Sequence, residues 1–247
     1  MPLPAADFDP TESAVPWRIL THAGVRLRFA TPVGAPASAD PRMLTGKGLG
    51  AFSRLLRARA DAVEAYRSMA ASAEFAHPLP YEALHAADFR GLILPGGHAP
   101  GMRVYLESRV LKALVVDFFR AGKPVGAICH GVLLAARSVD PVTGRSVLHH
   151  RRTTSLLRSQ ERFAYQLSRW WTGRYYLTYD VPVEDEVRSH LAHPSQFVRG
   201  PAPLFRDREA QLERGFTVRD GPYLSARWPG DAHKFARDYL DALSDQP

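Results

Sequence analysis

Cys129 is the only cysteine of the chain, and its surroundings are typical of a reactive thiol. It follows the apolar run 124–128, within Gly126-Ala-Ile-Cys-His-Gly131, and directly precedes a predicted helix. Small residues on both sides permit the strand-to-helix turn of a nucleophile elbow, which presents a side chain at the carboxyl edge of a sheet. The helix N-terminus favours a thiolate there. We therefore predict a nucleophilic cysteine, and the alternative is a buried cysteine that acts as a small hydrophobic residue.

A glycine-rich turn, Pro95-Gly96-Gly97-His98, follows a second apolar run at 89–94. Glycines at such a place let the backbone approach a ligand and direct N–H groups at it. The N–H groups of Gly97 and His130 would together form an oxyanion hole. We predict that Gly96, Gly97 and His98 line the substrate site, and an ordinary tight turn is the alternative.

The order of apolar patterns around these motifs predicts the fold class. The strand 89–94, the helix 106–120, the strand 124–128 and the helix 132–138 form a βαβ pattern, which indicates a parallel sheet covered on both faces. Further patterns predict helices at 11–23, 52–73, 159–171, 183–191 and 231–243, strands at 25–30 and 152–157, and a hairpin turned at Asp220-Gly221. A single domain, 1–247, accounts for this order.

Composition excludes several classes of protein. The 247 residues are 45% hydrophobic and 23% charged, as in a soluble globular protein with one core. One cysteine excludes disulfide scaffolds, zinc fingers and iron–sulfur ferredoxins. The net charge is +7, but its basic residues, mostly arginine, are scattered without a run, so we expect no nucleic-acid partner.

The apolar stretches are shorter than the roughly 18–20 residues that span a bilayer, so we expect no membrane partner. The acidic, proline-containing start lacks the pattern of a signal peptide, and a cytoplasmic location is expected. His149 and His150 have no further ligand at metal-binding spacing, so we predict an exposed loop pair and no metal.

Three motifs in this order resemble the ThiJ/PfpI superfamily: Glu12 in Asp9-Pro-Thr-Glu12, Pro-Gly-Gly-His at 95–98 and Ala-Ile-Cys-His-Gly at 127–131. This class I glutamine amidotransferase-like group includes PfpI proteases and heat-shock glyoxalase III enzymes. The resemblance runs from Phe8 to about Leu240, with inserted segments at about 40–84 and 162–215, and the first insertion is similar to the larger glyoxalase III-like branch. It implies a flavodoxin-like three-layer α/β/α sandwich with a mostly parallel central sheet and a C-terminal β-hairpin. We also expect a homodimer.

The resemblance implies a role for each matching residue. Cys129 would be the nucleophile, His130 its neighbouring base, and Glu12 the acid that hydrogen-bonds the sulfur and holds or accepts its proton. Glu12 can do so near pH 7 only if burial raises its pKa; by position alone it is a first-turn acid favoured by the helix dipole. Glu161 is the best match for the acid that orients the histidine in glyoxalase-like members.

Two segments depart from the family pattern. Only Met1–Pro4 precedes the first loop, where the family has a full central strand. The aromatic segment 163–180 has no counterpart that we can place. Such density most often fills a core or a subunit interface, and a lid over the pocket is the alternative.

The resemblance favours a glyoxalase or deglycase-like enzyme that acts on a small reactive carbonyl without a cofactor. Arg103 would attract anionic substrates at the mouth of the site. The same cysteine would also suit an amidase or peptidase. A stress-protective, redox-sensing protein and an amidotransferase domain that serves a partner synthetase are the remaining alternatives.

Overall fold

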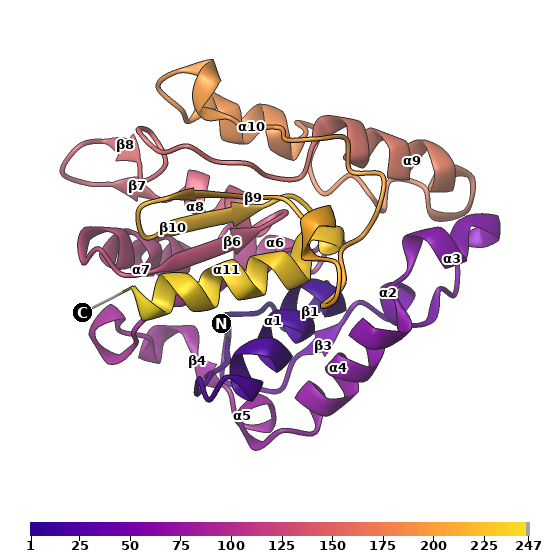
Figure 1. The fold of residues 1–247 in the computed structure, drawn as a ribbon, viewed down its shortest axis with the longest axis horizontal. Helices are drawn as coiled ribbons and strands as arrows, with labels where there is room; N and C mark the ends of the chain where they lie inside the picture. Colours follow the sequence, from indigo (N-terminus) through magenta and orange to yellow (C-terminus); the bar gives the residue numbers. More distant parts are fainter. Residues whose placement is uncertain (246–247) are drawn as a thin grey trace.

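A four-stranded sheet lies at the centre of the chain, in a computed structural model that describes residues 1–245 (Figure 1). Its strands lie in the order β5 (Leu92–Leu94), β6 (Val125–Ile128), β10 (Tyr223–Ala226) and β9 (Thr217–Asp220). The first three are parallel, and β9 pairs with β10 antiparallel. Gly221 turns this hairpin at a φ of +59°, so the predicted strands and the C-terminal hairpin are confirmed.

Helices cover both faces of the sheet. The helix α11 (Ala232–Ser244) lies across β6 and β10, and α1 (Pro10–His22) packs against it. The helices α7 (Arg109–Arg120) and α8 (Gly131–Ala136) cover the opposite face (Figure 1). This is the expected three-layer α/β/α arrangement, and its core joins side chains from all three layers.

The central elements follow from their sequences. Every residue of β5 and β6 is buried, which explains the continuous apolar runs, as expected for strands covered on both faces. In α7 the buried side chains recur at helical spacing, and the Ser108 side chain caps the helix by accepting a hydrogen bond from the Leu111 N–H at 3.2 Å. The Asp9 carboxylate caps α1 in the same way, through the N–H groups of Thr11 and Glu12.

Two predicted helices are interrupted in the structure. The prediction 52–73 is divided into α3 (Ser53–Leu56) and α4 (Ala60–Ala70), because the Ala58 N–H leaves the helical ladder and donates to the Met43 carbonyl at 2.9 Å. The prediction 106–120 begins only at Arg109, and Leu106 closes a separate helix, α6 (Met102–Leu106).

Two predicted strands are largely wrong. Residues 152–157 form one isolated bridge, Thr153 with Phe197. Of 25–30, only the end lies in a strand, β2 (Ala30–Thr31), which pairs with β4 (Leu79–Pro80). Pro2 and Pro4 have no N–H to donate, so the segment Met1–Pro4 makes only a short pairing with Ala30.

The remaining elements lie around this centre. They are β1 (Ala6–Phe8) paired with β3 (Ser38–Ala39), α2 (Pro41–Thr45), α5 (Ala73–Ala76), the β7 (Val139–Asp140) and β8 (Arg145–Ser146) hairpin, α9 (Arg158–Thr172) and α10 (Val183–Ser189). The predicted helices 159–171 and 183–191 are thus confirmed. Within residues 1–245, no helix is both long and apolar enough to cross a membrane.

The two inserted segments meet above one end of the sheet. A second, small core cluster joins Met43 and Leu49 of the first insertion to Tyr176 of the second. The side chain of Tyr175 also hydrogen-bonds the Asp40 carboxylate, and α9 lies beside the first insertion (Figure 1). We call residues 173–182, which connect α9 to α10, the lid loop.

Candidate active site

Cys129 stands at a strained turn between β6 and α8. Its φ is +57°, and Asp7 is the only other non-glycine residue with positive φ among residues 1–245. Such strain costs about 1–3 kcal/mol and is typical of a nucleophile elbow. The turn needs glycine at 131, because a Cβ there would lie 2.0 Å from the Leu94 carbonyl oxygen. The Cys129 N–H donates to the Ala226 carbonyl at 3.0 Å, which fixes the turn to β10.

Glu12 lies beside the sulfur of Cys129 and is fully buried. The first turn of α1 delivers it, and its Oε2 accepts a hydrogen bond from the Gly96 N–H at 2.9 Å. The other oxygen, Oε1, has no hydrogen bond that meets normal geometry within residues 1–245. Burial raises the pKa of Glu12 well above its ordinary value, Asp9 raises it further, and the thiol and the Gly96 N–H offset part of the rise. The carboxyl group is therefore held protonated, as its expected role requires.

The Cys129 thiol is itself protonated in this closed site. Burial raises its pKa well above the ordinary value, and the acidic groups of Glu12 and Asp9 raise it further. The His130 N–H acts in the opposite direction, but the short helix behind it does not outweigh desolvation. The expectation of a resting thiolate is therefore reversed, and the sulfur needs a base to become a nucleophile.

His130 is fully buried, and both of its ring nitrogens have neighbours. Nδ1 lies 3.4 Å from the Cys129 sulfur, and Nε2 lies 3.0 Å from the Thr178 hydroxyl oxygen. Burial lowers the pKa of His130 to about 3, helped by His98 and Arg137. The ring is therefore neutral, with one nitrogen free to accept a proton.

Glu161 is placed away from this histidine. Its Oε2 accepts a hydrogen bond from the Val183 N–H at 3.1 Å, where α10 begins. Burial raises its pKa to about 7. The neighbour of His130 Nε2 is thus Thr178 rather than the acid that the resemblance suggested. Thr178 has no motif around it, and its only sequence signal was the aromatic segment that contains it.

The glycine-rich turn packs against the elbow. A Cβ at Gly96 would lie 2.6 Å from Glu12 Oε2 and 2.7 Å from the His130 backbone nitrogen. Gly97 has a φ of +149°, and its N–H donates no hydrogen bond to another residue within 1–245. The Gly97 and His130 N–H groups therefore remain the predicted hydrogen-bond donors to an oxyanion. The Gly96 N–H already donates to Glu12.

His98 is enclosed by the lid loop. Its ring stacks on Tyr176 at a centroid distance of 4.3 Å and meets the edge of Tyr175 at 4.7 Å. Burial lowers the pKa of His98 to about 3, so the ring is neutral. The aromatic segment is therefore divided: Tyr175 and Tyr176 pack around His98, while Trp170 and Trp171 are exposed on α9. Cys129 is only 5% exposed.

Two arginines hold the lid loop. Arg103 donates from Nε and Nη2 to the Thr178 carbonyl oxygen at 3.1 and 2.6 Å. Arg137 lies over the Tyr179 ring at 4.2 Å and forms a two-pronged ion pair with Glu186. The Arg103 guanidinium, predicted to attract anionic substrates, thus binds the protein's own backbone.

The remaining histidine pair lies elsewhere. His149 Nδ1 hydrogen-bonds the His190 carbonyl oxygen at 3.2 Å, and its ring meets the edge of His150. Residues 1–245 contain no group of three or more histidine, cysteine or acidic side chains arranged to hold a metal ion.

Fold and site together define a flavodoxin-like α/β protein with a cysteine at a nucleophile elbow, faced by a buried glutamic acid. A family model described as ThiJ/PfpI family-like matches residues 3–201, and the chain belongs to this family. Glyoxalase III from Candida albicans has the same fold, with a TM-score of 0.66 at 17% identity over 95% of this chain and 87% of that one. DJ-1beta from Drosophila melanogaster has a TM-score of 0.56 at 16% identity, over 99% and 89%.

In sequence, the chain is 26% identical to a deglycase from Thermococcus kodakarensis, over 67% of this chain and 69% of the relative. The first curated relatives are matched over only 16% to 43% of their own length. The comparisons therefore show the family and the fold.

Proposed function

We propose that this protein is a cysteine-dependent glyoxalase or deglycase-like enzyme that converts a small α-oxoaldehyde of the methylglyoxal class to a 2-hydroxy acid. The observation that carries the proposal is the placement of a protonated Glu12 and a neutral His130 on either side of the Cys129 thiol. Relatives named as a deglycase and a glyoxalase III favour this reaction over others open to the same groups.

The chemistry begins with the thiol. As His130 Nδ1 takes the thiol proton, the sulfur attacks the aldehyde carbon, and the aldehyde oxygen gains a proton to give a hemithioacetal. A base then removes the hydrogen on that carbon, and the neighbouring ketone carbon is protonated. The proton of the new hydroxyl group passes to the former ketone oxygen, which yields a thioester of the 2-hydroxy acid. Glu12 is suited to supply or hold these protons, because burial raises its pKa well above the ordinary value. Water cleaves the thioester and restores the thiol, so the overall reaction adds one water.

The enclosure of the sulfur supports a small substrate. Cys129 is only 5% exposed, so a small carbonyl compound would reach its sulfur more readily than a peptide. The Gly97 and His130 N–H groups are suited to stabilise the oxyanion that forms on sulfur attack.

The test is the loss of methylglyoxal and the appearance of lactate with purified protein. We expect turnover by the wild type and none by Cys129→Ala, because no other residue of the chain is a thiol. Cys129→Ser is the matched control, because it puts a hydroxyl group of similar size in place of the thiol. It should also be inactive. Comparable far-UV circular dichroism spectra would show that both variants are folded.

Each alternative gives a different result. Cys129-dependent cleavage of a peptide, or release of ammonia from glutamine, would replace this proposal with a hydrolase. Equal loss of methylglyoxal with wild type and Cys129→Ala would overturn the assignment, and a wild type without any turnover would leave a non-catalytic thiol protein.

A further inference from the structure

The Thr178 side chain joins the lid loop to the base of the active site. Its hydroxyl oxygen lies 2.7 Å from the His98 carbonyl oxygen and 3.0 Å from His130 Nε2. The residue is only 4% exposed. Its own carbonyl oxygen is held by two hydrogen bonds from Arg103. The hydroxyl group is thus fixed by contacts on its backbone and on its side chain.

The positions of the protons follow from counting donors. A carbonyl oxygen has no proton, so the close contact with His98 is a hydrogen bond only if Thr178 donates its single hydroxyl proton there. The hydroxyl oxygen must then accept from His130, which places the imidazole proton on Nε2. In this tautomer Nδ1 carries a lone pair, and Nδ1 is the nitrogen 3.4 Å from the Cys129 sulfur.

We propose that Thr178 is the positioning residue for the base: it holds His130 in the Nε2–H tautomer and directs the Nδ1 lone pair at the thiol proton of Cys129. This inference rests on the proposed function only in that Cys129 is the nucleophile. In the step concerned, the S–H bond breaks and its proton passes to Nδ1, while the sulfur electron pair bonds to the electrophilic carbon. The imidazolium that forms keeps its second N–H on the Thr178 oxygen.

A hydroxyl group differs from a carboxylate in this place. A carboxylate would stabilise the imidazolium strongly, whereas a neutral hydroxyl selects the tautomer and leaves the buried ring uncharged at rest, in line with the lowered pKa of His130. The titratable and charged groups that act on the thiol and the ring are Glu12, Asp9, His98 and Arg137. Within residues 1–245, Thr178 supplies the hydrogen bond to Nε2. The lid loop that supplies Thr178 therefore also orients the base.

The experiment measures alkylation of the thiol by iodoacetamide as a function of pH, which reports on Cys129 alone because the chain has one cysteine. In Thr178→Val the ring loses its acceptor, so the tautomer is no longer fixed and the thiol proton is lost less readily. We expect the apparent pKa of alkylation to rise by about one unit, which corresponds to about tenfold slower reaction at pH 7. The rate at high pH, where the thiol ionises without a base, should be unchanged.

Two further variants separate positioning from structure. Thr178→Ser keeps the hydroxyl and should restore the wild-type profile. Val181→Ala alters the same loop at a side chain that is 51% exposed, so it should also keep that profile. Nitrogen-15 NMR of the His130 ring should show the Nε2–H tautomer in the wild type and a mixture in Thr178→Val.

The proposal is overturned if Thr178→Val retains the wild-type alkylation profile, or if the wild-type ring carries its proton on Nδ1. Alkylation needs no turnover, so the result is independent of the substrate. A protein that shows the Thr178 effect but consumes no methylglyoxal would contradict the proposed function and leave this inference standing.

Discussion

At the scale of single residues, Glu12 is the clearest case in which burial prepares a group for chemistry. Because burial holds its carboxyl group protonated, glutamine imitates its shape and charge and still offers an oxygen to the Gly96 N–H. We expect Glu12→Gln to fold with unchanged stability but to lose proton transfer, which lowers turnover by roughly 100- to 10,000-fold. Steady-state kinetics with methylglyoxal, beside urea denaturation, measure both quantities. Turnover close to that of the wild type would remove Glu12 from the reaction.

The residues that could be predicted from the sequence are those that lie in local motifs. Cys129 and His130 are neighbours in a strand-to-helix turn, and the glycine at 131 is required by its approach to the Leu94 carbonyl. Thr178 could not be predicted, because its contact with His130 joins residues 48 positions apart through a loop without regular structure. The prediction of Glu161 depends on a strand at 152–157, which the chain does not form.

At the scale of elements, the site depends on how the two insertions pack together. Their polar and aromatic contacts, such as Tyr175 with Asp40 and Tyr176 with His98, are made between segments that are far apart in the sequence. Amphipathic spacing predicted that α4 and α9 would be helices, but not that the loop after α9 would contact His98 and His130. Long-range packing of this kind has no periodic signal in the sequence. From its sequence alone, the aromatic segment 163–180 is therefore compatible with a core, a subunit interface or a lid.

Glu161 connects two of these elements, α9 and the start of α10, and gives the fold a pH dependence. Its folded pKa of about 7 is above the unfolded value of 4.5, so the folded state binds the proton more tightly. Below pH 4.5 the carboxyl group is protonated in both states, so it costs no stability. The free energy of unfolding then falls as the pH rises to about 7.

Glutamine at 161 does not titrate and keeps an acceptor for the Val183 N–H. We expect the free energy of unfolding of Glu161→Gln, relative to the wild type, to increase between pH 5 and pH 8 by up to about 3 kcal/mol. Urea denaturation across this range measures the difference. A difference that is constant with pH would show that Glu161 is ionised in the folded protein at all these values.

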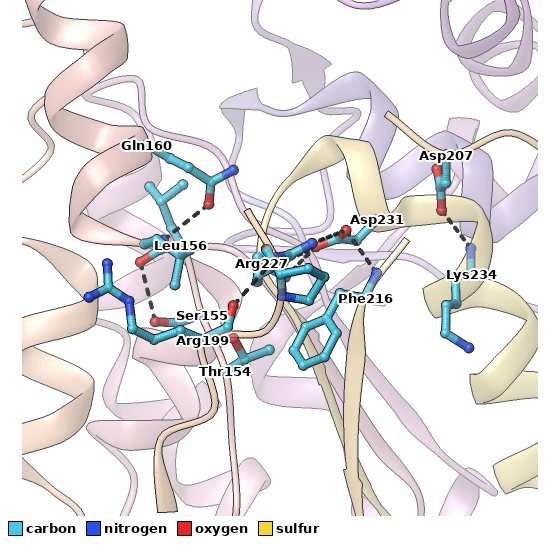
Figure 2. A network of polar contacts seen from close by, with 12 residues as sticks. Thr154, Ser155, Leu156, Gln160, Arg199, Asp207, Phe216, Arg227, Asp231 and Lys234 are labelled. Atoms are coloured by element: carbon cyan, nitrogen blue, oxygen red, sulfur yellow. Dashed lines mark hydrogen bonds and ion pairs between the residues drawn. The ribbon is translucent and has the colours of Figure 1, made fainter. Parts of the chain in front are cut away.

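At the scale of the whole molecule, a buried ion pair joins the end of the central sheet to its surroundings. Arg227 follows β10 and binds Asp231 through Nε and Nη2, each at 2.9 Å, with side-chain exposures of 1% and 0% (Figure 2). Arg227 also donates to the Pro201 carbonyl oxygen, and Asp231 accepts from the Phe216 N–H. This pair thus joins the β9–β10 hairpin, the segment before it and the start of α11. It lies at the end of β10, the strand that fixes the Cys129 turn.

Removal of either partner leaves the other buried without its counter-charge, which is costly in a medium of low polarity. We expect Arg227→Met and Asp231→Asn each to lower the free energy of unfolding by about 3–5 kcal/mol. The double variant should be less destabilised than the sum of the two, because neither charge then remains unpaired. Equilibrium urea denaturation of all four proteins gives the coupling energy, and strict additivity would show that the pair does not act as a unit.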